Sequence, residues 1–452
     1  MKYKFGFNTK IKNNLILNKG LSEKVVRQIS KIKSEPKWML NFRLNSYKIF
    51  KKLKNPAWGP SLVFINFDEY YYFSQPIKDE QKEWKNLPQS IKNTFNKLKV
   101  PEIEAKILSG INNQFDSKSI YHNIVKEFEQ KGVIFCSIDE AIKKHSKIVK
   151  KYFAKLVCNN DNKYAALNSC VWSGGSFLYV PKNVKIDKPL QSYFRINTKS
   201  VGQFERTLII IEENSEATYM EGCTAPIYDK NNLHAAVVEV FVNKNARFRY
   251  STIQNWSTNV LNLVTKRAIV SENGYIEWID GNIGSGLNMK YPSTILMGNN
   301  SAGKCISVAT SGKNMIQDTG AKMIHIGKNT RSSIISKSIA TNGGTCNYRG
   351  LIKITSQASE SFSEVICDSL ILDDKSKSDT IPNESIYNNT SFIKHEAKVS
   401  EMDKEILFYL NSRGIEEKEA KHLFSLGFIQ PFIKELPLEY AVELNRLLKT
   451  II

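Results

Sequence analysis

Three residues whose side chains bind metals or act in nucleophilic catalysis stand near the end of the chain: Cys367 and the adjacent pair His395 and Glu396. A thiolate, an imidazole and a carboxylate are all metal ligands, but three ligands do not complete a closed tetrahedral site. A thiol and an imidazole are also typical of a cysteine nucleophile with its base, although no oxyanion-hole glycine motif accompanies them here. The residues alone leave three interpretations open: a metal site, a nucleophile with its base, or three unrelated residues.

A second cysteine, Cys223, stands in the segment EGCTAP, whose glycine and proline predict the end of a strand at a turn. Lys266 follows inside the apolar run NLVTKRAIV, where burying an unpaired lysine is costly. A cation close to a thiol lowers the pKa of the thiol and favours the reactive thiolate. Considered alone, Lys266 is more simply interpreted as a solvated lysine at a strand edge.

The segment GNNSAGKC resembles a phosphate-binding loop. Gly298, Gly303 and Lys304 have the required spacing, but Cys305 stands where Ser or Thr would bind magnesium. Such a loop needs a helix after it, because the helix N-terminus binds the phosphates. The following segment CISVAT is typical of a strand, so we interpret the glycines as a corner between strands. A chain with weak ATPase activity of its own remains an alternative function.

The charge and the cysteines restrict the class of protein. The net charge is +20, which permits a basic nucleic-acid-binding β-solenoid as a second alternative. Lysine outnumbers arginine 53 to 11, whereas nucleic-acid readers favour arginine, so we expect no DNA partner. Seven widely spaced cysteines indicate free thiols in a reducing compartment rather than a disulfide framework. No stretch approaches the roughly 20 apolar residues of a membrane span.

The elements that would position these residues fall into three regions. Residues 1–160 are predicted to be mostly helical, with Ser22 as the N-cap of an early helix. Residues 161–390 contain short β-branched runs separated by Asn, Gly, Asp and Ser, which predicts one all-β unit. Segments such as MIHIGKNTRSSIISKSIATNGG are typical of solenoid rungs, so a β-solenoid is favoured over a sandwich or barrel, although no strict period is visible. Residues 391–452 are predicted to form a C-terminal helical region.

The C-terminal region is predicted to become helical after His395. Ser400 begins a pattern that resembles a capping box, and Gly414 and Gly427 stand where C′ glycines end helices. Pro437 falls in the first turn of a last helix. The apolar face of this helix is formed by Leu438, Ala441, Val442 and Leu448. Such a face would either pack on the β unit or dock a partner protein.

Many long segments, in the same order from about Gly20 to the C-terminus, resemble the SufB/SufD family of iron–sulfur cluster assembly proteins, and within it the SufB branch. They include FERTLIIIEENSEATYMEGCTAPIYDKNNLHAAVVEV, YSTIQNW, VTKRA, DTGAKMIHIGKNTRSSIISKSIA, CDSL, HEAKVS and ELPLEYAVE. The resemblance implies a mainly β protein: a right-handed parallel β-helix core flanked by N-terminal and C-terminal helical regions. This agrees with the strands and corners predicted from the residues.

The resemblance also implies roles for individual residues. Those implied to accept sulfur and relay it through the β-helix are Cys223, Gln254, Trp256 and Lys266. Those implied to bind a nascent 4Fe–4S or 2Fe–2S cluster and its iron are Cys367, His395 and Glu396. Lys394 departs from the family pattern, because many members carry an acidic residue there. The substitution removes one carboxylate next to the implied ligands and adds a positive charge.

Partners and location follow from the same resemblance. It implies a scaffold rather than an enzyme, in a complex with the ATPase SufC and with SufD or a second SufB. SufC would hydrolyse ATP and dock on the C-terminal helical region. Sulfur would arrive from the cysteine desulfurase SufS through the carrier SufE, and a role for reduced flavin stays open. The excess of Lys, Asn and Ile predicts a plastid gene of the apicoplast type, hence the plastid stroma, or otherwise a reducing compartment similar to cytosol.

Overall fold

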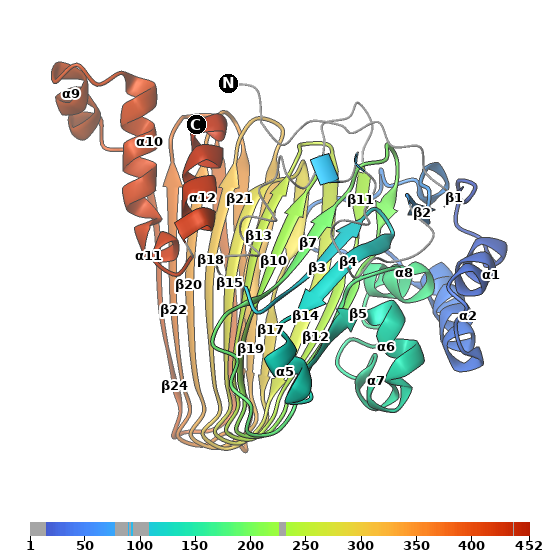
Figure 1. Cartoon of the computed structure of the whole chain (residues 1–452). Helices are drawn as coiled ribbons and strands as arrows, with labels where there is room; N and C mark the ends of the chain where they lie inside the picture. The colour runs from blue at the N-terminus through green and yellow to red at the C-terminus, as the bar shows by residue number, and fades with distance from the viewer. Residues whose placement is uncertain (1–14, 77–88, 90–91, 94–107, 226–231, 437) are drawn as a thin grey trace.

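The chain forms a parallel β-solenoid with helices before and after it, which confirms the predicted fold class (Figure 1). The computed structural model describes residues 15–76, 89, 92–93, 108–225, 232–436 and 438–452. Within these ranges the solenoid strands form two sheets, of ten and twelve strands, and β1 (Leu15–Ile16) pairs separately with β2 (Ser74–Gln75). None of the described helices is both long enough and apolar enough to cross a membrane.

The ten-stranded sheet, called the first sheet below, carries most of the residues with predicted roles. Its order is β24-β22-β20-β18-β15-β13-β10-β7-β3-β4, and its strands are parallel except for the hairpin β3–β4. The strands are β3 (Gly110–Phe115), β4 (Lys118–Ile124), β7 (Leu190–Arg195), β10 (Glu216–Thr224), β13 (Arg247–Trp256), β15 (Tyr275–Gly284), β18 (Ala302–Ser311), β20 (Arg331–Ala340), β22 (Phe362–Ile371) and β24 (Phe392–Glu401).

The second sheet lies across the interior and follows the order β23-β21-β19-β16-β14-β12-β9-β6-β5, with three short strands paired at its side. The strands are β5 (Ile134–Ser137), β6 (Ser176–Val180), β8 (Gly202–Gln203), β9 (Arg206–Ile211), β11 (Asn232–His234), β12 (Val237–Val242), β14 (Val260–Val270), β16 (Leu287–Lys290), β17 (Ser293–Leu296), β19 (Ile316–His325), β21 (Thr345–Ile354) and β23 (Lys377–Ile386). Large inward side chains such as Tyr250 and Trp278 fill the space between the sheets.

An asparagine ladder marks one corner of the solenoid. At six successive turns an asparagine adopts a positive φ, a conformation that asparagine tolerates better than other residues with a Cβ. Five of the six side-chain amides donate to the asparagine of the preceding turn, at 2.8–3.1 Å. The ladder consists of Asn183, Asn214, Asn245, Asn273, Asn300 and Asn329. The Asn-rich corners predicted from the sequence are therefore the elements that reverse the chain.

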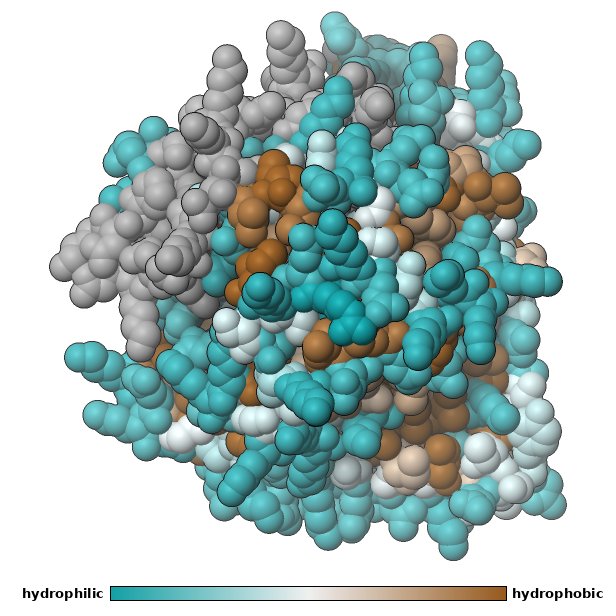
Figure 2. Space-filling model, turned by 90° about the vertical axis from the view of Figure 1, so that its right-hand side faces the viewer, coloured by the Kyte–Doolittle hydropathy of each residue, from teal (hydrophilic) through white to brown (hydrophobic). Residues whose placement is uncertain are grey.

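The N-terminal region is less helical than predicted. It contains α1 (Glu23–Ile32), α2 (Lys37–Lys52), η1 (Phe67–Glu69), α5 (Lys126–Gln130), α6 (Ile138–Lys144) and α7 (Ser146–Tyr152), but also strands β3, β4 and β5. A further helix, α8 (Lys163–Val171), lies just inside the region 161–390 that was predicted to be all-β. The predicted N-cap is confirmed, because the Ser22 hydroxyl accepts a hydrogen bond from Val25 N at 3.3 Å. Helices α1, α2 and α8 pack on the outer face of the second sheet. Figure 2, which views this side, shows a mostly hydrophilic surface with separate apolar patches.

The C-terminal region differs from the prediction at its start. The chain does not become helical after His395, because β24 continues to Glu401. The helices are α9 (Lys404–Ser412), α10 (Glu417–Phe428), α11 (Gln430–Ile433) and α12 (Leu438–Ile451). Asp403, not Ser400, caps α9 by accepting from Glu405 N at 2.8 Å, so the predicted capping box was wrong.

The two predicted C′ glycines of this region have different outcomes. Gly414 follows α9 with φ +84°, as a C′ glycine should. Gly427 lies inside α10, so that predicted helix end was wrong, whereas Pro437 falls outside the described residues. Leu448 is buried where α11 and α12 pack on the outer face of the first sheet, beside Ile279 and Ile306. The last helix therefore packs on its own chain.

Candidate functional site

The strands of the first sheet separate two environments, because successive side chains point to opposite faces. The outward residues of β10, β13 and β15 face solvent or the C-terminal helices. The inward residues form a continuous line in register, here called the interior polar row. It consists of Glu221, Thr252, Asp280, Ser307, Ser336 and Cys367, all buried. Sequence reasoning identified only its last member, since the others become neighbours only through strand pairing.

Cys223 lies at one end of this row, one residue before the end of β10. It is buried, with 1% of its surface exposed. Its Sγ lies 3.8 Å from Oε1 of Glu221, and the Tyr250 hydroxyl donates to Oε2 of the same carboxylate at 2.5 Å. Burial raises the pKa of the Cys223 thiol well above its usual value, and Glu221 adds to the effect, while Lys266 opposes it. The thiol therefore needs a proton acceptor before it can act as a nucleophile, and Glu221 is adjacent to it.

The predicted relay residues Gln254 and Trp256 lie beside Cys223. Gln254 is the register partner of Cys223 on β13, and Trp256 packs in the same small cluster as the cysteine. Oε1 of Gln254 accepts from Asn262 at 2.8 Å and from Lys290 at 3.0 Å. Gln254 Nε2 and Trp256 Nε1 are buried without a hydrogen-bond partner among the described residues. Two free donors next to a buried thiol are suited to an anionic or polar guest such as a sulfur species.

Lys266 is not at a strand edge but is completely buried, reaching from β14 to the interior polar row. Its Nζ donates to Thr252 at 2.5 Å and lies 3.6 Å from Asp280. Lys290, which sequence reasoning missed, lies 3.1 Å from the same carboxylate. Burial lowers the pKa of Lys290 to about 8, and although burial alone would raise the pKa of Asp280, the two lysines hold it below its usual value. The middle of the row thus contains two cations and one carboxylate.

The sequence carried a weak signal for this second lysine. Lys290 stands in NMKYPS, again inside a run that becomes strand, as Lys266 does. A lysine in a buried strand must be paired, which predicts an acidic residue nearby. The identity of that partner, Asp280, depends on the packing of β15 against β14 and β16, and no sequence spacing predicts it.

Cys367 lies on β22 and is 2% exposed. Burial raises the pKa of its thiol to about 12, although the neighbouring Tyr348 hydroxyl opposes the shift. His395 and Glu396 lie on the adjacent strand β24, where His395 pairs in register with Val365 and Glu396 with Ile366. Cys367 and Val365 both face the interior, so His395 shares their face and Glu396 points to the other side of the strand.

Two further residues define the surroundings of this end. Nδ1 of His395 lies 2.7 Å from Oε1 of Glu384, which reaches in from β23 of the second sheet. Lys394, on the outer face with Glu396, pairs with Glu364 at 2.8 Å. The structure therefore brings Cys367, His395 and Glu384 together inside the last turn. It keeps Glu396 and Lys394 on the outside of that turn.

The two predicted ends of the relay are far apart. Counting β10, β13, β15, β18, β20 and β22, five strand spacings separate Cys223 from Cys367. At about 4.8 Å for each spacing, the distance along the row is roughly 24 Å. No group of three or more His, Cys, Asp or Glu side chains within the described ranges is arranged to hold a metal ion. Direct contact between the two cysteines is excluded by this distance.

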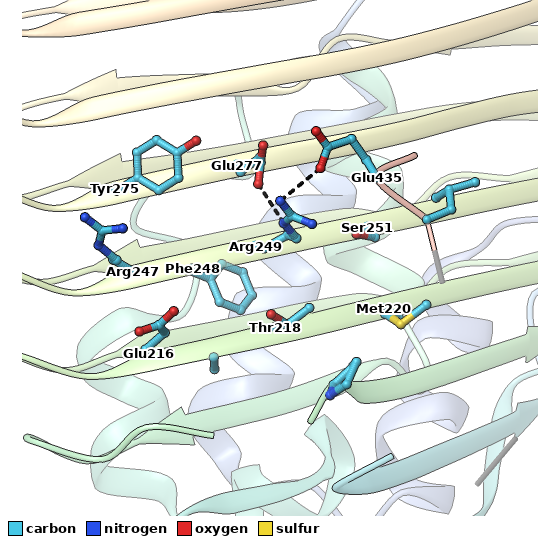
Figure 3. Close-up of a pocket in the computed structure, with 13 residues that line it drawn as sticks. Glu216, Thr218, Met220, Arg247, Phe248, Arg249, Ser251, Tyr275, Glu277 and Glu435 are labelled. Atoms are coloured by element: carbon cyan, nitrogen blue, oxygen red, sulfur yellow. Dashed lines mark hydrogen bonds and ion pairs between the residues drawn. The ribbon is translucent and has the colours of Figure 1, made fainter. Parts of the chain in front are cut away.

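A groove of about 500 Å³ lies on the opposite, outer face of β10, β13 and β15 (Figure 3). Arg249 donates there to Glu277 at 2.6 Å and to Glu435 at 3.1 Å. Glu435 lies in the segment between α11 and α12, so this ion pair fastens the C-terminal helices to the solenoid. None of the predicted relay residues lines the groove.

The phosphate-loop-like segment does not have the geometry that ATP binding requires. Strand β18 begins at Ala302, so Gly298 and Lys304 lie at a corner and in a strand, with no helix N-terminus after them. Nζ of Lys304 lies 3.3 Å from Glu277 and 3.7 Å from Glu435. The lysine therefore belongs to the same fastening as Arg249, and the strand predicted for CISVAT is confirmed.

Two family models and several known proteins match this chain. A family model described as "SUF system FeS cluster assembly, SufBD core domain" matches residues 194–428, and one described as "SufBD protein N-terminal region" matches residues 63–192. Iron–sulfur cluster assembly SufBD family proteins of Staphylococcus haemolyticus (strain JCSC1435) and Staphylococcus aureus (strain USA300) are each 53% identical over 447 residues. The similarity covers 99% of this chain and 96% of each relative.

Proposed function

Because this chain belongs to the SufB/SufD family of iron–sulfur cluster assembly proteins, we propose that it is a scaffold of the SufB type. It accepts persulfide sulfur at Cys223 and builds a nascent cluster at Cys367. The observation that carries the proposal is the interior polar row, which joins the two buried cysteines through the solenoid. The cluster, of the 4Fe–4S or the 2Fe–2S type, is the cargo of this reaction rather than a resident cofactor.

The acceptance step uses the pair of Cys223 and Glu221. Glu221 takes the thiol proton, and the resulting thiolate attacks the outer sulfur of a persulfide on a carrier such as SufE, charged by SufS. The S–S bond of the carrier breaks and its thiolate leaves, so that Cys223 holds the persulfide. Burial raises the pKa of this thiol, while Lys266 and Lys290 oppose the rise and would stabilise the anions that form.

The sulfur then has to cross roughly 24 Å, which is beyond the reach of any one side chain. We propose that it moves along the interior polar row, where hydroxyl groups of Thr252, Ser307 and Ser336 replace the hydration of an anion. Gln254, Trp256 and Lys266 contact only the first part of this route. The sulfur leaves Cys223 as hydrosulfide only after two electrons cleave the S–S bond of its persulfide, so the reduction takes place at Cys223 before the anion moves. Reduced flavin is the candidate electron donor.

Blocking the second half of the route tests this proposal. Ser336→Leu places an apolar side chain in the row one strand before Cys367. We expect cluster assembly from desulfurase-supplied sulfur to slow on the order of tenfold or more, because the hydroxyl is lost and the passage is filled. Assembly from added sulfide, which reaches the last turn directly, should stay near the wild-type rate. Both rates are read from the visible absorption of the cluster.

A matched control uses the same strand and the same replacement. Ser333→Leu lies on β20 but on its outer face, in register with Glu364. It should leave both sulfur sources equally effective. Unchanged assembly of Ser336→Leu with desulfurase would show that the row is not the route.

The assembly end offers an incomplete set of ligands. Cys367 and His395 face the interior of the last turn, while Glu396 faces outward. A cluster needs about four protein ligands, so the remainder would come from a neighbouring subunit, SufD or a second copy, placed against β23 and β24. These strands are the last of their sheets among the described residues, and Phe392 and Tyr387 beside them are exposed. Loosely held clusters are the ones that a scaffold can release.

We propose that SufC docks on α9 and α10. Phe408 of α9 is 75% exposed, and Ile406, Tyr409 and Leu423 expose further apolar surface nearby. Glu435 fastens the adjoining segment to the solenoid, so ATP-driven movement of SufC would be transmitted to the first sheet. We place the complex in a reducing compartment, and in a plastid stroma if the gene is plastid-encoded. The relatives reported above are bacterial, and they do not support a plastid origin.

The function as a whole is tested by the complex and its cargo. Co-expressed with SufC and SufD and purified without oxygen, the chain should elute with both partners. After reconstitution with iron, cysteine and desulfurase it should carry iron and acid-labile sulfide, which are measured chemically. A chain that binds neither SufC nor SufD and gains no sulfide would overturn the proposal.

A further inference from the structure

The last turn of the solenoid holds a carboxylate that neither the sequence nor the family assigned, Glu384 on β23. Its Oε1 lies 2.7 Å from Nδ1 of His395. It lies close enough to Cys367 and Tyr348 to act on the electrostatics of both side chains. Because β23 belongs to the second sheet, Glu384 approaches the ligands from across the interior. It is therefore a second partner of the assembly end, independent of the motif around His395.

The other ring nitrogen of His395 has no such partner. Its Nε2 is buried and makes no hydrogen bond with any described residue. Ser378 Oγ and Thr380 Oγ1, on the inward face of β23 with Glu384, are buried and unpartnered in the same way. A buried polar atom without a partner is uncommon, because no hydrogen bond compensates for the loss of its hydration. The three atoms are spread along the inner face of the last turn, because Ser378 and Thr380 precede Glu384 on the extended strand β23. The unpartnered atom beside Glu384 is therefore Nε2 of His395.

We propose that Glu384 is a positioning residue, which holds His395 as the Nδ1–H tautomer and leaves the Nε2 lone pair free to bind iron. The inference rests on the proposed assembly of a cluster at Cys367. A carboxylate oxygen accepts only, so at 2.7 Å the ring nitrogen facing it must carry the proton. A histidine that binds a metal commonly donates its other N–H to a carboxylate, which fixes the tautomer and the orientation of the ring.

The same geometry shows that the carboxylate next to His395 in the sequence is not the one that contacts its ring. Glu396 is the sequence neighbour of His395 but lies on the outer face of β24. Glu384 belongs to the preceding strand β23, on the other side of the corner that joins β23 to β24, and it contacts the ring. The carboxylate that serves the histidine is thus supplied by the opposite sheet, and Glu396 is available to a neighbouring subunit.

The tautomer is measured on the complete chain before any iron is added. With ¹⁵N-labelled histidine, and with His395→Gln to assign the signal, wild type should show the Nδ1–H form. Glu384→Ala should shift the signal towards the Nε2–H form, while Glu384→Gln should retain Nδ1–H because its amide oxygen also accepts. Glu364→Ala, which removes a carboxylate from the outer face of the same turn, is the matched control and should resemble wild type. An unchanged tautomer in Glu384→Ala would overturn the proposal.

The reconstituted cluster gives a second readout. Pulsed electron paramagnetic resonance of the reduced cluster should show a strongly coupled histidine nitrogen in wild type and Glu384→Gln, and loss of that coupling in Glu384→Ala. If Cys367→Ser forms the cluster as well as wild type, the proposed function fails. If Cys367→Ser prevents assembly while Glu384→Ala retains both tautomer and coupling, only the role of Glu384 fails.

Discussion

Cys367→Ser is expected to lower the amount of cluster formed on the complex by on the order of 100-fold, whatever the source of sulfur. Substituting a residue that only hydrogen-bonds a metal ligand commonly lowers metal affinity about 10- to 100-fold. Removing a thiolate that binds iron directly should lower it at least as much. Cys367 is the only cysteine of the interior polar row, and Tyr348 and His395, the polar residues described beside it, offer oxygen and nitrogen. Anaerobic reconstitution with iron and sulfide, followed by visible absorption, measures the loss.

The control for this variant is another buried thiol of the same sheets. Cys346 on β21 is also buried, but its Sγ lies 3.1 Å from the Ser311 hydroxyl, away from the row. Cys346→Ser should form cluster normally. Normal assembly in Cys367→Ser would show that the cluster forms elsewhere.

Cys223→Ser is expected to separate the two sources of sulfur. With desulfurase and carrier, cluster formation should fall by on the order of 100-fold, because a serine hydroxyl does not form a persulfide. With added sulfide the rate should stay close to wild type, since Cys367 lies roughly 24 Å away and is unchanged. Parallel reconstitutions, one with each source, measure the ratio of the two rates.

Cys170→Ser tests whether any buried thiol would behave in this way. Cys170 lies in α8 and donates to the carbonyl of Leu167 at 3.1 Å, a contact that a serine can reproduce. The Cys170→Ser variant should form cluster at the wild-type rate with either source of sulfur. Equal loss of both in Cys223→Ser would mean that Cys223 is needed for folding or for the cluster itself, not for the acceptance of sulfur.

The strands that sequence reasoning missed have a common physical cause. β24 is exposed on much of both faces, so the segment FIKHEAKVSE lacks the alternation of apolar and polar residues that predicts a strand. β3 is fully buried but contains GINNQF, in which the side chains of Asn112 and Gln114 are hydrogen-bonded by neighbours rather than by water. In both cases pairing with another strand, β22 or β7, holds the segment extended. The solenoid repeat was also not visible in the sequence, because its length varies: partners in the asparagine ladder are 27 to 31 residues apart.

The sequence by itself determined the family, the solenoid and the residue types available for chemistry. Corners favour asparagine or glycine and strands favour β-branched residues, so short segments of the sequence are enough to predict both. Only the tertiary structure decided which residues face one another. Adjacent residues of a strand point to opposite sides, which separates His395 from Glu396, and register aligns Glu221 with Cys367 over five strand spacings. Glu384 reaches His395 because the chain turns a corner between β23 and β24, so that the two strands face each other across the interior from different sheets.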